Sequence, residues 1–155
     1  MNSRMKSPAL TVPGAMEALQ ALSKAVAQAG LPRQTLEMCN LRASQINGCS
    51  VCVDMHCRAL QKLDEKSERI FSVSAWREAP YYSDAERAAL ALTEAMTRLS
   101  DRADPVPDEL WAEAARHFSE KELSSLVLSI GTINVWNRLN AATKQVSGAW
   151  LSQYV

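Results

Sequence analysis

Apolar residues recur at steps of three and four along most of the chain, which is the spacing of the buried side of an α-helix. The clearest run is Met16, Leu19, Leu22 and Val26, which ends at Gly30. No stretch alternates as a β-strand does. The pattern predicts an all-α fold, a single-domain bundle of about six to seven helices packed as antiparallel neighbours, with segments that begin near residues 13, 32, 49, 67, 83, 108 and 119.

Several helix boundaries carry signals of their own. Ser83 and Ser119 are each followed three residues later by glutamate, which is the capping-box pattern that opens a helix. Asn47-Gly48 is a turn dipeptide and predicts the end of the second helical segment. Residues 1–12 show no such pattern, so we expect a flexible N-terminal tail followed by one domain over residues 13–155, a length that suits a single core.

Composition and charge narrow the partners and the compartment. Lys and Arg number 17 and so do Asp and Glu, which gives no electrostatic reason to bind nucleic acid or an anionic membrane. The four cysteines are crowded into residues 39–57, whereas the disulfide framework of a secreted domain spreads them. No stretch has the length of a signal-peptide core or a membrane span. We therefore expect a cytoplasmic protein with no nucleic-acid or membrane partner.

The candidate chemistry is concentrated in the third helical segment. Cys49, Cys52 and His56 follow one another at steps of three and four, so they share one face of a helix that starts at Cys49. Only the thiolate of cysteine is a nucleophile, and a free thiol with a pKa of about 8.5 is mostly protonated at neutral pH. A helix N-terminus and a neighbouring histidine both favour the thiolate, and a second thiol one turn away traps an oxidised sulfur as a disulfide. This spacing predicts a redox site.

A carboxylate adds to the site if the chain reverses at Asn47-Gly48. Glu37 lies twelve residues before Cys49 on the preceding helical segment. After the turn, its side chain is expected to approach His56 or Cys52 from the neighbouring helix.

The arrangement Glu37, Cys49-x-x-Cys52 and His56 resembles the AhpD-like branch of the carboxymuconolactone decarboxylase family, typified by alkyl hydroperoxidase D. The resemblance implies an AhpD-like domain and a thiol-dependent peroxidase in which Cys52 reacts with a hydroperoxide and Cys49 resolves it as a disulfide. Glu37 and His56 would form the proton relay, and an external dithiol or thiol protein would re-reduce the pair without any cofactor. Alkyl hydroperoxidase D has a further histidine between its cysteines, where this chain has Val51.

Other readings of these residues stay open. A redox-sensing or interaction module without turnover would use the same cysteines, and a carboxymuconolactone decarboxylase activity is disfavoured because those enzymes lack the cysteine pair. Zinc could use Cys49, Cys52, His56 and Cys57, but structural zinc sites usually draw ligands from two elements, so we expect no metal. Cys57 points away from Cys52 on the same helical segment, and Cys39 falls on the apolar stripe of the preceding one, so both are assigned to the core.

The chain is also expected to assemble. The resemblance implies trimers or hexamers, and the four tryptophans are more aromatic surface than a core of this size needs, namely Trp76, Trp111, Trp136 and Trp150. We therefore predict a homo-oligomer. Asn137 and Arg138 resemble a pair found late in family members, although packing and a salt bridge explain them equally well.

Overall fold

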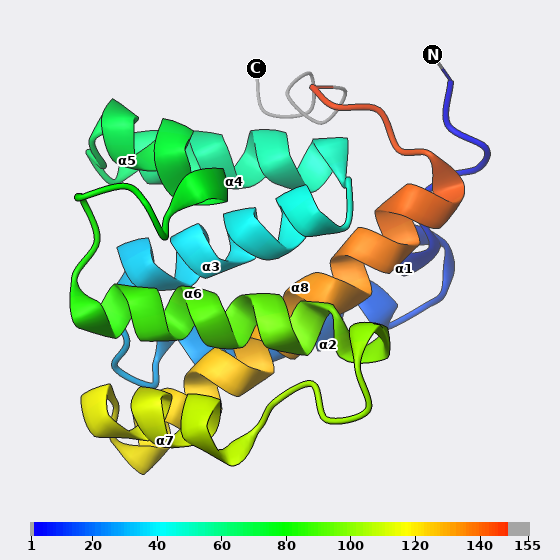
Figure 1. The fold of residues 1–155 in the computed structure, drawn as a ribbon. Coiled ribbons are helices and arrows are strands. Elements are labelled where there is room, and N and C mark those ends of the chain that lie inside the picture. Colours follow the sequence, from blue (N-terminus) through cyan, green and yellow to red (C-terminus); the bar gives the residue numbers. More distant parts are fainter. Residues whose placement is uncertain (1, 149–155) are drawn as a thin grey trace.

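The computed structural model describes residues 2–148. Within that range the chain forms eight α-helices and two short 3₁₀ helices, with no β-strand (Figure 1). The elements are α1 (Pro8–Thr11), α2 (Ala15–Ala27), α3 (Arg33–Ile46), α4 (Ser50–Lys62), α5 (Ser67–Ser72), η1 (Val73–Ala75), α6 (Asp84–Thr97), η2 (Leu99–Asp101), α7 (Asp108–His117) and α8 (Glu120–Thr143). The predicted all-α class is confirmed.

Helix α3 lies at the centre of the fold. It packs against α4, α6 and α8, and α4 runs back alongside it after a short turn (Figure 1). Half of its residues are buried: Thr35, Leu36, Met38, Cys39, Leu41, Ala43 and Ser44. An element covered on several sides positions its neighbours, and α3 therefore fixes how α4 and α8 approach each other.

The boundary signals of the sequence are confirmed. Ser83 and Ser119 both form complete capping boxes at the starts of α6 and α8. Gly48 adopts a left-handed conformation with φ of 65° after α3, and the N–H of Cys49 bonds back to the carbonyl of Ser44 at 3.0 Å. This is the pattern of a glycine-terminated helix, and it turns the chain directly into α4.

Two expectations about the fold need correction. There are eight α-helices in residues 2–148 rather than six to seven, and the additional one, α1, lies in the segment that we expected to be a loose tail. The main-chain N–H of Arg4 donates to the carbonyl of Thr143 at 2.8 Å, and its guanidinium donates to the carbonyl of Ala142 at 2.9 Å. Periodicity cannot reveal α1, because four residues span barely one turn, nor the contact of Arg4 before it, because the partner is 138 positions away.

The fourth predicted segment is also divided. Helix α5 ends at Ser72 and continues as the 3₁₀ turn η1, which places Trp76 in the core at 6 % exposure. No helix within the described residues has the length and apolar character needed to cross a membrane.

Candidate functional site

The two cysteines of the motif form a disulfide at the start of α4. Cys49 is the N-cap residue of that helix, and its sulfur accepts a hydrogen bond from the main-chain N–H of Cys52 at 3.3 Å. The expectation that Cys49 stands at a helix N-terminus is confirmed. This position gives the Cys49 sulfur both a backbone donor and the positive end of the helix dipole.

The disulfide is buried. Cys49 and Cys52 are only 2 % and 3 % exposed, and they form a small apolar cluster with Ala43, Val51 and Ile133. Half-buried Trp136 of α8 packs on the same cluster. A thiolate formed here would have lost most of its water, so its stability depends on the hydrogen bonds that the protein supplies.

The structure brings Glu37 and His56 together, as the sequence predicts. Nδ1 of His56 donates to the Glu37 carboxylate at 2.7 Å, and both side chains are largely buried. With Nδ1–H held by the carboxylate, Nε2 is the basic nitrogen of the neutral imidazole. Arg33 lies 3.8 Å from the other carboxylate oxygen, which is beyond hydrogen-bond distance.

Helix α4 links these two parts of the site. His56 lies four residues after Cys52 on the same helix, so the two side chains face one side of α4. Among residues 2–148, however, no hydrogen bond joins His56 to either sulfur, and its polar partner is Glu37. The geometry therefore contains a disulfide and a histidine–carboxylate pair on one helix face, with the carboxylate supplied by α3.

Sequence reasoning missed a third contributor, which comes from α8. The side-chain amide of Asn140 donates to the sulfur of Cys52 at 3.3 Å across 88 positions of sequence. No local pattern identifies it, because asparagine within a helix gives no periodic or motif signal. Its neighbour Asn137 is fully buried and belongs to an amide network with Asn47 and Ser44.

Comparisons with known proteins agree with this picture. The model of the carboxymuconolactone decarboxylase family matches residues 13–95, which is more than half of the chain. The chain belongs to the carboxymuconolactone decarboxylase family. It is also 38 % identical over 130 residues to the uncharacterized protein YdfG of Bacillus subtilis, covering 84 % of this chain and 87 % of that protein.

A second relative of this chain is matched over only part of its own length. The uncharacterized protein YnjA of Escherichia coli is 33 % identical over 101 residues, which cover 65 % of this chain. The matched part is 54 % of the length of YnjA, so about half of that relative is represented here.

Solved structures place the chain in the AhpD-like branch of the family. An Agrobacterium tumefaciens protein of unknown function, described as a candidate AhpD antioxidant defence protein, superimposes with a TM-score of 0.88 at 33 % identity. The match covers 96 % of this chain and 99 % of that protein. The debrominase Bmp8 shares the fold alone, with a TM-score of 0.79 at 22 % identity over 88 % of this chain and 73 % of that one. The AhpD-like fold is confirmed.

The other two cysteines of this family member lie in the main core, as predicted. Cys39 is 1 % exposed, and burial raises the pKa of its thiol to about 12. Cys57 is half-buried against the same core. Burial, and to a smaller extent the nearby charge of Asp54, raises the pKa of its thiol. Both are free thiols, and their raised pKa values disfavour the reactive thiolate at neutral pH.

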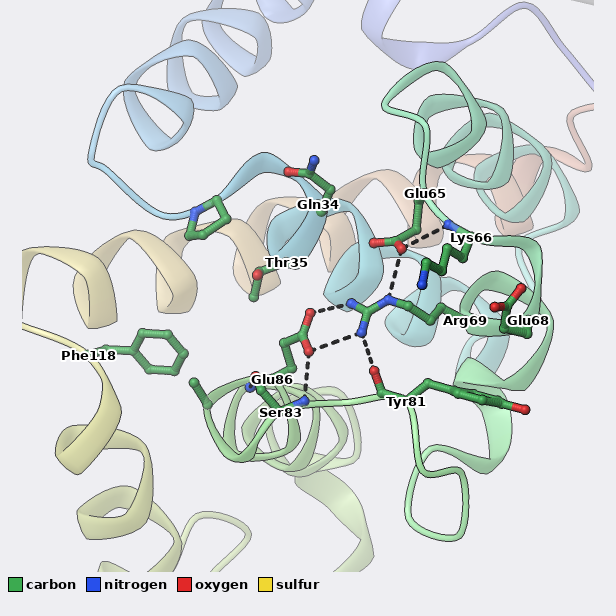
Figure 2. A pocket seen from close by; sticks show the side chains of 12 residues that line it. Gln34, Thr35, Glu65, Lys66, Glu68, Arg69, Tyr81, Ser83, Glu86 and Phe118 are labelled. Carbon is green, nitrogen blue, oxygen red and sulfur yellow. Dashed lines mark hydrogen bonds and ion pairs between the residues drawn. The ribbon is translucent and has the colours of Figure 1, made fainter.

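One cavity lies away from the disulfide. It has a volume of about 670 Å³, and its lining, which is drawn in Figure 2, includes Thr35 and Phe118 but none of the four predicted site residues. Arg69 crosses it and binds the carboxylates of Glu65 and Glu86 (Figure 2). Because the polar groups at its centre already satisfy one another, we assign this region to holding α5, the turn before it and α6 together. Within residues 2–148 no group of His, Cys, Asp or Glu side chains is arranged to hold a metal ion.

Proposed function

We propose that this protein is a thiol-dependent peroxidase of the alkyl hydroperoxide reductase type. The observation that carries the proposal is the combination of a redox disulfide at a helix N-terminus with a buried histidine–carboxylate pair on the same helix face. The branch to which the chain belongs includes a candidate antioxidant defence protein, which supports the same chemistry.

In the proposed cycle, Cys52 reacts first. The Nε2 atom of His56 accepts the thiol proton of Cys52, and the thiolate attacks one oxygen of a hydroperoxide. The S–O bond forms while the O–O bond breaks, and the leaving alkoxide takes the proton to give an alcohol. Glu37 orients His56 and stabilises the imidazolium that exists between the two proton transfers.

The second half of the cycle uses Cys49. Its sulfur attacks the sulfenic acid on Cys52, so that the S–S bond forms, the S–O bond breaks and water is released. An external dithiol or thiol protein then returns two electrons by thiol–disulfide exchange and restores both thiols. The proposed setting is a reducing compartment, the cytoplasm, where such donors are available.

We propose that the subunits form a homo-oligomer, a trimer or a hexamer. Leu10, Leu22 and Leu128 are 51 %, 37 % and 48 % exposed on α1, α2 and α8, which are elements that pack against one another. Trp111 is 45 % exposed, whereas Trp76 is buried in the core. Trp150 lies outside the described residues. Light scattering that finds a monomer at micromolar concentration would contradict the assembly.

The test of the function is steady-state consumption of a hydroperoxide with an added dithiol donor. The Cys52→Ser variant should lose all turnover. The Cys49→Ser variant should be oxidised once at Cys52 and then accumulate sulfenic acid, because the resolving thiol is absent. Activity retained in Cys52→Ser, with the sulfenic acid found on Cys49 by mass spectrometry, would reverse the two roles.

A redox sensor without turnover is the second candidate. The near-complete burial of both sulfurs favours it, because a buried disulfide exchanges slowly with an external donor. The same assay separates the two functions. A sensor consumes one equivalent of peroxide per subunit and stops, whereas an enzyme continues until the donor is exhausted.

A further inference from the structure

We propose that Asn140 is a catalytic residue of this site, whose side-chain amide is the donor that stabilises the thiolate of Cys52. The contact that carries the proposal is the hydrogen bond from Nδ2 of Asn140 to the Cys52 sulfur at 3.3 Å. The catalytic meaning of this contact rests on the proposed peroxidase function, although the hydrogen bond itself does not.

The two sulfurs of the disulfide are supplied with donors in different ways. The Cys49 sulfur accepts the main-chain N–H of Cys52, which any sequence at this helix start would provide. The Cys52 sulfur is equally buried and accepts from Asn140. Val51, which stands between the cysteines, has an apolar side chain and offers no donor. The stabilisation of a Cys52 thiolate therefore depends on a side chain from another helix.

An amide has an advantage over a titrating group in this position. It donates at every pH at which the protein is folded, so the donor is already in place when the proton leaves the Cys52 thiol. A hydrogen bond to an ionised acceptor is stronger than one to a neutral sulfur, so Asn140 favours the reduced, ionised form of Cys52 over the disulfide. The same donor would assist when an external thiolate attacks Cys49 and Cys52 leaves as the thiolate.

Helix α8 is held in place for this contact. Asn137, one turn before Asn140, is fully buried, and its amide donates to the hydroxyl of Ser44 at 3.0 Å while its carbonyl accepts from Asn47 at 2.8 Å. The main-chain carbonyl of Ser44 accepts the N–H of Cys49. Asn137 thus ties α8 to the turn that presents the cysteines, and we assign it a positioning role.

The experiment is a pH titration of the thiolate by ultraviolet absorbance in the Cys49→Ser background, where no intramolecular disulfide can form. The transition of Cys52 is identified by its loss when Cys52→Ser is added to this background, which leaves only the buried thiol of Cys39 and the half-buried thiol of Cys57. Asn140→Leu should move this transition about 1 to 2 pH units to the alkaline side, since a charge-assisted hydrogen bond is lost. Asn140→Asp, which keeps the shape but replaces the donor by a carboxylate, should move it at least as far.

The matched control is Thr132→Val on the same helix. Thr132 is buried, and within the described part of the chain its hydroxyl donates to one group, the carbonyl of Leu128 in α8, at 2.7 Å. This variant should lose stability without moving the titration. An unmoved transition in Asn140→Asp, or a shift in Thr132→Val as large as that in Asn140→Leu, would overturn the proposal.

The two proposals fail separately. If the wild type turns over no peroxide but Asn140→Asp moves the titration, the role of Asn140 in stabilising the thiolate stands and the peroxidase function falls. If the wild type is active and its Asn140→Leu variant keeps both the titration and the pH–rate profile, the function stands and Asn140 is only structural. The expected result is a rate at pH 7 reduced about 10- to 100-fold and partly recovered at alkaline pH.

Discussion

Glu94 and Glu37 are both largely buried carboxylates, yet they sit in contrasting surroundings. Glu94 on α6 is 4 % exposed and accepts from Arg42, Arg77 and the indole N–H of Trp76 at 2.6, 2.6 and 3.0 Å, with Arg98 at 3.4 Å. Among residues 2–148, Glu37 has one hydrogen-bond partner, the imidazole of His56, and Arg33 lies 3.8 Å away. The first carboxylate has several fixed partners on both oxygens, whereas the second is committed to a group that can gain or lose a proton.

The electrostatics of Glu94 follow from its partners. Burial alone would raise its pKa, but the hydrogen bonds from Arg77, Trp76 and Arg42 outweigh burial and hold the pKa below its usual value of 4.5. A carboxylate locked in its ionised form cannot exchange protons near neutral pH. Burial and charge therefore do not by themselves mark a catalytic acid. The number and kind of partners separate a structural carboxylate from a candidate proton relay.

Peroxide turnover should change most when the proton relay of Glu37 and His56 is altered. Glu37→Gln keeps size and hydrogen bonding but removes the charge that stabilises the imidazolium of His56, so peroxide turnover should fall about 10²- to 10⁴-fold. His56→Gln should behave alike, and the double variant should be little worse than either because the two act as a unit. The measurement is the rate as a function of pH, with partial recovery expected at alkaline pH. Normal turnover in Glu37→Gln would remove this residue from the site.

The next effect is on stability and concerns the other carboxylate. Glu94→Gln leaves the arginines without their shared anion and should destabilise the fold by about 2–3 kcal/mol, below the full cost of breaking a buried pair because Arg77 and Arg98 are partly exposed. Urea unfolding measures this loss. Turnover of the folded variant should remain near that of the wild type. A variant that keeps its stability but loses its activity would exchange the roles that we give to the two carboxylates.

A smaller effect should appear in acid. The pKa of Glu94 is depressed in the folded state, so its stabilising contribution is present above the unfolded value of 4.5 and is lost as pH falls through the folded value. The stability of the wild type should therefore decrease more steeply below pH 4.5 than that of Glu94→Gln. Urea midpoints taken at a series of acidic pH values test this difference. Parallel curves for the two proteins would show that Glu94 is not the linked group.

The smallest loss of stability is expected when the N-cap residues of α6 and α8, which lie far from the disulfide, are replaced. Ser83→Ala removes the N-cap acceptor of α6, where the Ser83 hydroxyl accepts from the N–H of Glu86 at 3.3 Å. Loss of such a cap typically costs about 1 kcal/mol. Ser119→Ala at the start of α8 is the matched variant. Thermal unfolding should show a similar small loss in both, and a change in turnover in either variant would mean that cap stability reaches the site.

Much of the local structure could be predicted from the sequence because its causes lie within a few residues. The capping boxes at Ser83 and Ser119 and the turn at Gly48 place helix ends by short-range hydrogen bonds and backbone conformation. The spacing of Cys49 and Cys52 likewise requires only one turn of helix. Even the contact between Glu37 and His56 was predictable, because a short turn between two helices makes them antiparallel neighbours.

Contacts between residues far apart in the sequence, at the site and elsewhere, were settled by the packing of the helices. Asn140 reaches the Cys52 sulfur across 88 positions, Trp76 and Arg42 meet at Glu94 from different elements, and Arg4 closes the end of α8 across 138 positions. A single asparagine or arginine carries no periodicity that would reveal its partner. Such contacts depend on how α3, α6 and α8 pack, which is determined by the burial of many side chains together and by no local pattern.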